Sequence, residues 1–496
     1  MRGVFGYEDF RPGQEKIIAA VIGGRDCIGV MPTGAGKSLT FQIPARILPG
    51  TVLVVSPLIS LMKDQVDALT RYGFRATVLN SSIDFETRRD RLKRMRAGEY
   101  ELVYVAPEGL EGSLRTLLTQ VQVSLVVVDE AHCISEWGHD FRPAYRRLCG
   151  LKQELGGVPI LALTATATRR VVGDIIRQLG MVKPDGFKGS FFRSNLKLWA
   201  HKKGDGRGSR QDILGFVRRR VGESGIIYSL SRKNVDTLAA FLATNGVRAL
   251  PYHAGLDEET RARHQDLFAR DEVDVVVATI AFGMGIDKSN VRYVIHREMP
   301  RSIEGYTQEI GRAGRDGCAS DCLLLYSWAD VIAHERMQST IEDDVVRTAA
   351  RAKTKAMFEL ADAGGCRHQR LVATFDETIP SCGDACDNCR GVSLGEALVA
   401  ARAGKAAVAK PAGPKLATAT PLSAAAAALF ERLRVLRRSL ADAEGVPAYI
   451  VFSDAVLARM ATVRPNDDAG MLAVPGVGPA KLARYGAAFL QALGEE

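Results

Sequence analysis

The sequence has 496 residues, of which 46% are hydrophobic and 25% are charged. This composition excludes a disordered or fibrous chain, and the length is enough for several globular domains. Basic residues exceed acidic ones, 66 to 57, which gives a net charge of +9 and favours polyanionic partners without identifying one. No secretion signal or bilayer-spanning apolar stretch is apparent, so we expect a cytoplasmic protein with no membrane partner.

Short apolar runs rich in β-branched residues alternate with helix-like stretches through the first two thirds of the chain. Buried parallel strands have this composition. The pattern predicts an α/β protein with two successive parallel-sheet domains, residues 1–188 and 189–327. The runs are Thr51–Val55, Leu102–Val105, Leu125–Val128, Ile160–Leu163, Ile226–Tyr228 and Val273–Ala278.

The rest of the chain divides by composition into three segments. Residues 328–392 combine a helical pattern with clustered cysteines and predict a helical hairpin with a metal-binding module. Residues 393–422 are dominated by Ala, Lys, Gly and Pro, which is typical of a flexible linker. Helical spacing returns at Leu429, Leu433, Leu436 and Leu440, so residues 423–496 are predicted to form a small helical domain.

A glycine-rich string follows the apolar run Ile28–Met31 and has the composition of a phosphate-binding loop. Its glycines would let backbone N–H groups converge on oxyanions, Lys37 would reach the outer phosphates, and the Ser38 hydroxyl would ligate Mg²⁺. Met31 stands where the usual pattern has its first glycine, so a simple glycine-rich turn remains the alternative. The string is Pro32-Thr33-Gly34-Ala35-Gly36-Lys37-Ser38.

Two carboxylates, Asp129 and Glu130, directly follow the run Leu125–Val128. They would lie at the carboxyl end of a buried strand, where open α/β sheets bind ligands. We expect Asp129 to hold Mg²⁺ and Glu130 to orient or deprotonate the attacking water. The alternative is a solvated turn at the end of the strand.

A third string carries two arginines three residues apart, which we expect on one face of a short helix. One of them would stabilise the charge on a transferring γ-phosphoryl group. We therefore count Gln308, Arg312 and Arg315 among the catalytic residues, with a surface salt-bridge pair as the alternative. The string is Gln308-Glu309-Ile310-Gly311-Arg312-Ala313-Gly314-Arg315-Asp316-Gly317.

Together these motifs resemble those of superfamily 2 helicases and, more narrowly, the RecQ family, over nearly the whole chain. The resemblance implies two RecA-like domains and an ATP-dependent DNA helicase that travels 3′ to 5′ in recombination and repair. The segment around Tyr7, Arg11 and Gln14 is similar to the family's adenine-reading motif, which implies stacking by Tyr7 and polar contacts from the other two. Residues 278–287 are similar to a motor motif, so we expect Thr279 to contact DNA and Gly285 and Asp287 to belong to the nucleotide site.

The segment Cys133–Pro143 is the one most similar to RecQ proteins. Its aromatic residues, with a histidine and an arginine, offer stacking faces and a phosphate contact to a single strand. The resemblance implies that this loop makes hydrolysis depend on DNA, whereas the alternative is that the side chains pack in the core. The expected DNA-contacting residues are Trp137, His139, Phe141 and Arg142.

Four of the nine cysteines are spaced C-x15-C-x3-C-x2-C. Such thiolates suit a closed, tetrahedral zinc site that stabilises the fold, and RecQ relatives carry a similar module here. An iron–sulfur cluster and free thiols are the alternatives. The predicted ligands are Cys366, Cys382, Cys386 and Cys389.

The last segment, from Ser423, resembles the HRDC domain, a helical nucleic-acid-binding module. Lys481, near Gly476 and Gly478, would meet phosphates, with a tight helix–helix turn as an equal alternative. Most RecQ proteins have a winged helix between the zinc module and this domain, but here we expect only the linker.

We therefore expect ATP, Mg²⁺ and structural Zn²⁺ as ligands. The expected partners are single-stranded and fork or junction DNA and a single-stranded-DNA-binding protein, with the chain itself a monomer. Two rival functions stay open. One is an RNA helicase of the same superfamily, and the other is a DNA-dependent ATPase that remodels complexes without unwinding.

Overall fold

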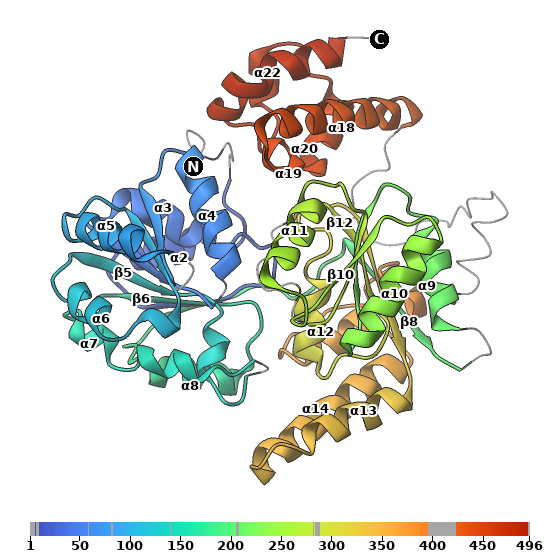
Figure 1. The fold of residues 1–496 in the computed structure, drawn as a ribbon, viewed down its shortest axis with the longest axis horizontal. Coiled ribbons are helices and arrows are strands. Elements are labelled where there is room, and N and C mark those ends of the chain that lie inside the picture. The colour runs from blue at the N-terminus through green and yellow to red at the C-terminus, as the bar shows by residue number, and fades with distance from the viewer. Residues whose placement is uncertain are drawn as a thin grey trace. The chain divides into compact units, whose positions relative to one another are not determined.

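A computed structural model describes residues 5, 9–57, 59–80, 83–138, 140–204, 208–280, 282, 288–394 and 423–494. Contacts within the chain divide it into two compact units, with the boundary between Phe191 and Phe192 (Figure 1). Each unit contains one parallel sheet, so the predicted pair of parallel-sheet domains is confirmed. None of the described helices is long and apolar enough to cross a membrane. The predicted domain boundaries stay predictions.

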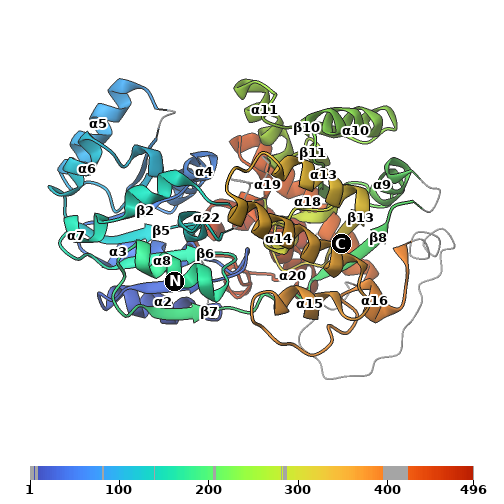
Figure 2. The ribbon, with the colours of Figure 1, turned by 90° about the horizontal axis from the view of Figure 1, so that it is seen from below.

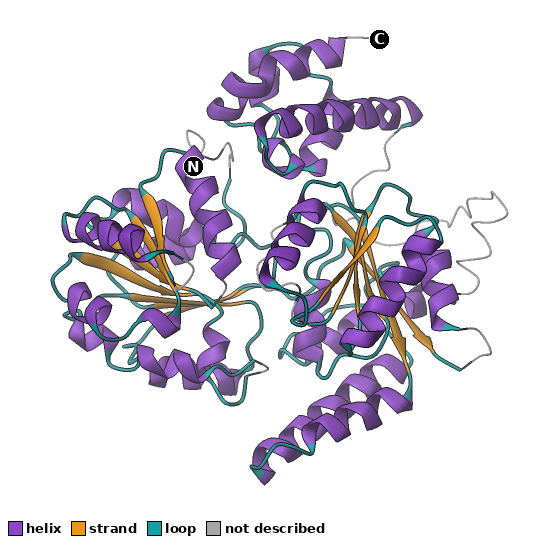
Figure 3. Cartoon of the chain, viewed as in Figure 1, coloured by secondary structure: helices purple, strands orange, loops and turns teal. Residues whose placement is uncertain are grey.

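The first unit contains a seven-stranded parallel sheet in the order β3-β4-β2-β5-β6-β1-β7. Strands β1, β2 and β4 are buried along their whole length, because helices cover both faces of the sheet (Figure 3). The strands are β1 (Cys27–Val30), β2 (Thr51–Val55), β3 (Ala76–Leu79), β4 (Leu102–Val105), β5 (Val123–Val128), β6 (Ile160–Thr164) and β7 (Asp185–Lys188). The helices are α2 (Gln14–Ile22), α3 (Leu39–Ile47), α4 (Ile59–Arg71), α5 (Phe85–Arg96), α6 (Ser113–Leu118), α7 (Leu151–Glu154) and α8 (Arg169–Gln178).

The second unit begins with a six-stranded parallel sheet in the order β10-β11-β9-β12-β13-β8. Its interior strands are the most apolar, and their side chains form one core with the flanking helices. The strands are β8 (Leu196–Lys202), β9 (Ser224–Tyr228), β10 (Ala249–Tyr252), β11 (Val275–Ala278), β12 (Val291–His296) and β13 (Ser320–Tyr326). The helices are α9 (Ser209–Val217), α10 (Arg232–Thr244), α11 (Glu258–Ala269) and α12 (Ile303–Ile310).

Two further helical regions follow this sheet. Helices α13 (Trp328–Gln338) and α14 (Asp344–Asp362) form the predicted hairpin and lie side by side, and the short helices α15 (Arg367–Ala373) and α16 (Asp387–Arg390) come next (Figure 2). The carboxyl-terminal helices pack around a core of their own, as predicted for residues 423–496. They are α18 (Ala424–Glu444), α19 (Ala448–Val451), α20 (Asp454–Val463), α21 (Asp468–Leu472) and α22 (Pro479–Gly494). The predicted linker lies almost entirely outside the described residues.

A buried carboxylate, Asp26, fixes one end of the first sheet just before β1. Its side chain is only 4% exposed. One carboxylate oxygen accepts hydrogen bonds from Lys152 Nζ at 2.6 Å and from the Ile160 backbone N–H at 2.8 Å, and the other accepts from the Val182 N–H at 2.6 Å. The group therefore joins α7, the start of β6 and the turn that precedes β7.

We expect Asp26→Ala to destabilise the first domain by about 3–5 kcal/mol, because an ammonium group and two backbone N–H groups would lose their buried acceptor. Hydrogen exchange of the β6 amides in the full-length chain measures this loss. The matched control is Glu99→Ala, which removes an exposed ion pair with Arg94 and should cost less than about 1 kcal/mol. Equal exchange rates in the two variants would contradict the role given to Asp26.

Candidate nucleotide and metal sites

The glycine-rich loop connects β1 to α3, as the sequence predicts. Gly34 and Gly36 have φ angles of 85° and 79°, a conformation that favours glycine. Lys37 extends from the end of the loop, and its ammonium group donates to the Met31 carbonyl at 3.2 Å. The loop thus brings backbone N–H groups and the Lys37 ammonium together at the carboxyl end of a buried strand, which is the arrangement that phosphate binding requires.

Two predicted adenine-contacting residues, Arg11 and Gln14, contact this loop directly. The Gln14 amide donates to the Gly36 carbonyl at 2.9 Å, and its oxygen accepts from the Arg11 backbone N–H at 2.8 Å. The Arg11 guanidinium donates to the Gly34 carbonyl. Gln14 is almost fully buried, so these bonds hold the loop through its Gly34 and Gly36 carbonyls. The sequence did not indicate this structural role. Their contacts with adenine stay a prediction.

The acidic pair lies at the carboxyl end of β5, next to the neighbouring strand β2. The Asp129 N–H donates to the Val55 carbonyl at 2.9 Å, and the Tyr145 hydroxyl donates to the Asp129 carbonyl at 2.8 Å. Glu130 adopts a left-handed φ of 47°, which turns the chain sharply after the strand. Burial, together with the charge of Glu130, raises the pKa of Asp129 to about 7, and the Lys37 ammonium opposes this rise. A cation beside Asp129 would therefore favour its charged form.

A histidine that the sequence analysis gave no role joins this pair to the next strand. His132 Nδ1 lies 2.9 Å from the Thr164 hydroxyl and 3.3 Å from a Glu130 carboxylate oxygen. The Thr164 hydroxyl in turn donates to the Thr166 carbonyl at 3.1 Å, so Nδ1 carries the proton in this arrangement. The end of β5 is thus coupled to the segment that leads from β6 into α8.

The aromatic loop closes on itself directly after this histidine. The Arg142 N–H donates to the Cys133 carbonyl at 2.9 Å, and its guanidinium pairs with Asp140 at 3.0 Å. Trp137 and Phe141 are only partly buried, and the Arg170 guanidinium lies 3.3 Å from the centre of the Trp137 ring. Their rings are therefore not part of the buried core, which was the alternative to a DNA contact.

The predicted placement of Arg312 and Arg315 on a helix is wrong. Helix α12 ends at Ile310, and both arginines lie in the turns that follow. Gly314 has a φ of 56°, and a Cβ there would come within 2.5 Å of the Asn195 amide nitrogen. Donors distant in sequence hold these turns: Arg193 donates to the carbonyls of residues 311 and 313, each at 3.0 Å, and Asn195 donates to that of Gly314 at 3.0 Å.

The remaining predicted residues of the second unit are placed as follows. Gln308 lies on α12, and Thr279 follows β11, where its N–H donates to the Tyr252 carbonyl at 3.2 Å. Lys481 lies on α22 with its ammonium 5.4 Å from the centre of the Phe452 ring, and burial lowers its pKa to about 8. Four predicted site residues lie outside the described residues: Tyr7, His139, Gly285 and Asp287.

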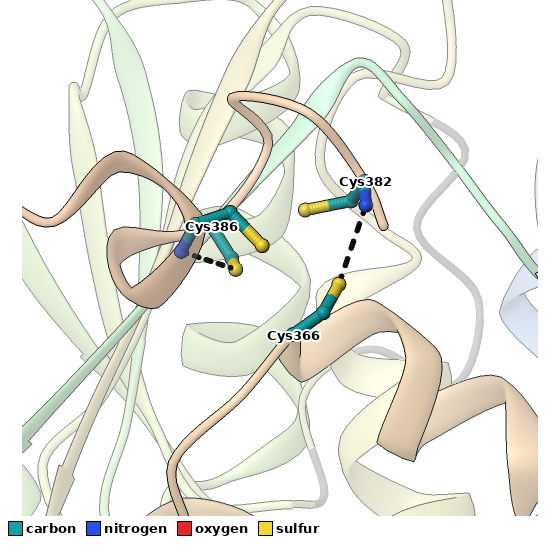
Figure 4. Close-up of side chains that lie close together, drawn as sticks. Cys366, Cys382 and Cys386 are labelled. Carbon is teal, nitrogen blue, oxygen red and sulfur yellow. Dashed lines mark hydrogen bonds between the residues drawn. The ribbon is translucent and has the colours of Figure 1, made fainter. Parts of the chain in front are cut away.

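The four clustered cysteines come together at the starts of α15 and α16. Their sulfur atoms all lie within 4.8 Å of one another. The Cys382 N–H donates to the Cys366 sulfur at 3.4 Å (Figure 4), and the Cys389 N–H donates to the Cys386 sulfur at 3.4 Å. A tetrahedral zinc ion with bonds of about 2.3 Å to sulfur fits four thiolates at this spacing.

This zinc module is attached to strand β8 of the second sheet. Arg367 and Asp387, both buried, form a two-point ion pair with distances of 2.6 and 3.1 Å. Asp387 also accepts from the Ala200 N–H at 2.9 Å, and the Leu198 N–H donates to the Ala385 carbonyl at 2.9 Å. The module and the edge of the sheet are therefore one hydrogen-bonded structure.

Four family models match the chain. A DEAD/DEAH box helicase model matches residues 11–175, a helicase conserved C-terminal domain 209–317, a RecQ zinc-binding model 328–390 and an HRDC domain 426–493. The predicted zinc ligands and HRDC domain are confirmed, and no winged-helix model matches.

Full-length relatives and solved structures agree with these matches. "ATP-dependent DNA helicase RecQ" of Pasteurella multocida is 38% identical over 99% of this chain and 92% of its own length, and the Bacillus subtilis protein of that name is 36% identical over 98% and 96%. The first alignment has 586 positions, so that relative contains segments that this chain of 496 residues lacks. In fold, the chain is similar to Mycobacterium smegmatis helicase Lhr bound to ssDNA and AMP-PNP, with a TM-score of 0.53 and 18% identity over 92% of this chain and 72% of that one.

We expect the purified chain to contain one zinc ion and to show no visible absorbance of an iron–sulfur cluster. Cys386→Ser should lose most of this zinc and should increase hydrogen exchange in α15 and α16, because the metal joins the starts of these two short helices. Cys149→Ser is the matched control, since this thiol lies outside the cluster. Full zinc content in Cys386→Ser would contradict the assignment.

Proposed function

This chain belongs to the RecQ family of ATP-dependent DNA helicases, and we propose that it hydrolyses ATP to move 3′ to 5′ along single-stranded DNA and separate the strands of a duplex in recombination and repair. The observation that carries the proposal lies at the neighbouring carboxyl ends of β5 and β6, where His132 lies 3.3 Å from the Glu130 carboxylate and hydrogen bonds join it to Thr164 and the acidic pair to the aromatic loop. The nucleotide chemistry and the expected DNA contacts therefore belong to one continuous segment.

For hydrolysis, we propose that the loop N–H groups of residues 33–38 and Lys37 bind the phosphates. Ser38 and Asp129 would hold Mg²⁺, which supplies positive charge to the phosphate oxygens. Glu130 would orient and deprotonate the attacking water, because it directly follows the strand end that carries Asp129. Arg312 or Arg315, with Gln308 nearby on the chain, would neutralise the charge that develops on the γ-phosphoryl group.

For coupling to DNA, we propose that bases stack on Trp137 and Phe141 while Arg142 contacts a phosphate. The Arg142 N–H bond to the Cys133 carbonyl anchors the loop next to His132. Movement of the loop when DNA binds would therefore reach His132 and, through it, Glu130. Thr279 and Lys481 would add backbone contacts elsewhere on the strand.

A second candidate function is a DNA-dependent ATPase that moves or remodels complexes without unwinding. One observation favours it: the zinc-module match ends at residue 390 and the HRDC match begins at 426, with no winged-helix match between them. The DNA helicase names of the full-length relatives favour unwinding of DNA over RNA. We further propose a cytoplasmic monomer that meets a single-stranded-DNA-binding protein on its substrate. None of the nine cysteines forms a disulfide, which fits a reducing compartment.

Strand displacement from a 3′-tailed and a 5′-tailed duplex, with and without ATP, tests the function itself. We expect ATP-dependent displacement from the 3′-tailed substrate only. ATP hydrolysis stimulated by DNA without any displacement would instead support the remodelling function, and stronger stimulation by RNA would support an RNA helicase.

We expect Lys37→Ala and Glu130→Gln each to lower the DNA-stimulated kcat for ATP by at least about 100-fold. Arg315→Ala should lower it by about 1,000-fold, because it removes a charge that stabilises the transition state. Steady-state phosphate release measures these effects, and Glu86→Gln, an exposed change of the same kind on α5, is the control. Near-normal ATP turnover in a folded Lys37→Ala variant would contradict the proposal that this loop binds the phosphates.

We expect Trp137→Ala to raise the DNA concentration for half-maximal ATPase stimulation by about 10-fold or more, because it deletes a stacking surface. ATP binding in the absence of DNA should not change. Trp137→Phe keeps an aromatic face and should restore most of the stimulation. If Trp137→Ala responds to DNA like the original chain, the loop is not the coupling element.

A further inference from the structure

A cavity of about 510 Å³ lies beside the aromatic loop, on the exposed side of α8. This volume is in the range of natural small-ligand sites. The wall formed by α8 contains an open position, because Gly173 has no side chain and a Cβ there would meet no atom within 4 Å. The lining residues are Trp137, Arg169, Arg170, Gly173, Asp174 and Arg177.

The charges around the cavity favour an anion. Three guanidinium groups line it together with one carboxylate, Asp174, which is buried and already pairs with Arg177 on the same helix. Arg169 and Arg170 are exposed at the start of α8. Among the described residues Arg170 has no carboxylate partner, and its guanidinium lies against the Trp137 ring instead. Positive charge therefore remains at this end of the cavity.

We propose that this cavity is a phosphate subsite for single-stranded DNA. Arg169 and Arg170 bind the phosphodiester group next to a base that stacks on Trp137. Guanidinium groups suit this ligand because they donate paired hydrogen bonds to phosphate oxygens. The proposal deepens the DNA contact proposed above and rests on it. It adds residues on α8, a helix that lies outside the aromatic loop.

The position of α8 gives this subsite a mechanical connection. Helix α8 begins three residues after Thr166, whose carbonyl accepts a hydrogen bond from the Thr164 hydroxyl. Thr164 in turn contacts His132. A phosphate bound at Arg170 would therefore affect the acidic pair by two routes. One runs through Trp137 and the aromatic loop, and the other runs from the start of α8 through Thr166 and Thr164 to His132.

The first test substitutes Gly173, where an added Cβ would meet no atom within 4 Å and where either new residue has a higher helix propensity than glycine. Gly173→Glu and Gly173→Gln fill the same space and differ only in charge. With a labelled oligo-dT strand at low salt, we expect Gly173→Glu to bind about 5-fold or more weakly than Gly173→Gln, because a carboxylate would repel the phosphate. The difference should shrink as salt rises. Equal affinities at low salt would overturn the subsite.

The second test removes the two arginines as Arg169→Gln with Arg170→Gln. We expect about 10-fold weaker oligo-dT binding and a salt dependence that is shallower by about 0.7 for each phosphate that the variant no longer neutralises. The control pair is Arg89→Gln with Lys93→Gln, two exposed basic residues on α5 of the same domain. An equal loss of affinity in both double variants would mean that only the total charge of the chain matters, and it would overturn the proposal.

An abasic oligomer separates phosphate from base recognition. Its binding should depend on Arg169 and Arg170 as strongly as that of oligo-dT, and loss of this dependence would overturn a phosphate subsite. The failures of the two proposals are also distinguishable. If the chain unwinds DNA normally while the two Gly173 variants bind alike, the subsite fails and the helicase function stands. If no unwinding occurs but the two Gly173 variants still differ in DNA affinity, the helicase function fails and the phosphate subsite stands.

Discussion

A parallel sheet that helices cover on both faces can expose polar chemistry only at the ends of its strands. In this chain β1, β2 and β4 are wholly buried, and so are the last four residues of β5. The groups proposed to act on the phosphates in the first domain therefore follow strands: the glycine-rich loop follows β1, and Asp129 and Glu130 follow β5. The predicted adenine contacts Arg11 and Gln14 lie before β1 instead. The apolar composition of the strands and the position of the site are consequences of the same burial.

The segments that follow neighbouring strands lie beyond the paired backbones of the sheet. Contacts between these segments are therefore made by side chains. His132 with Thr164, and Arg170 with Trp137, form two such bridges between the segment after β5 and the segment after β6. The second domain uses the same principle with backbone acceptors, since Arg193 and Asn195 satisfy carbonyl groups of the turns that contain its two arginines. Both sites are thus shaped by contacts between residues that are far apart in sequence.

The sequence was sufficient for most of the interior of the first sheet, and less so for the second sheet and for the edges of both. The β-branched runs located β2, β4, β5, β6, β9 and β11, but all four edge strands, β3, β7, β8 and β10, and the interior strands β12 and β13 escaped notice. Edge strands are partly exposed, as the alternating burial of β7 illustrates, so they lack a continuous apolar run. The metal ligands and phosphate loop were predictable because local spacing defines them. The turn around Arg312 was not, because Gly314 and the distant donors Arg193 and Asn195 decide its shape.

The attachment of the zinc module to β8 has a consequence for solubility. Strand β8 is at the edge of its sheet, and an uncovered edge offers unpaired backbone groups to other chains. Here the module covers part of that edge: Leu198 and Ala200 donate their N–H groups to it, and the segment at Cys386 pairs with β8 like an additional short strand. Loss of the metal would uncover these donors in an otherwise intact sheet. Zinc depletion would then lead to self-association through β8 before the nucleotide loop, which belongs to the other unit, loses its structure.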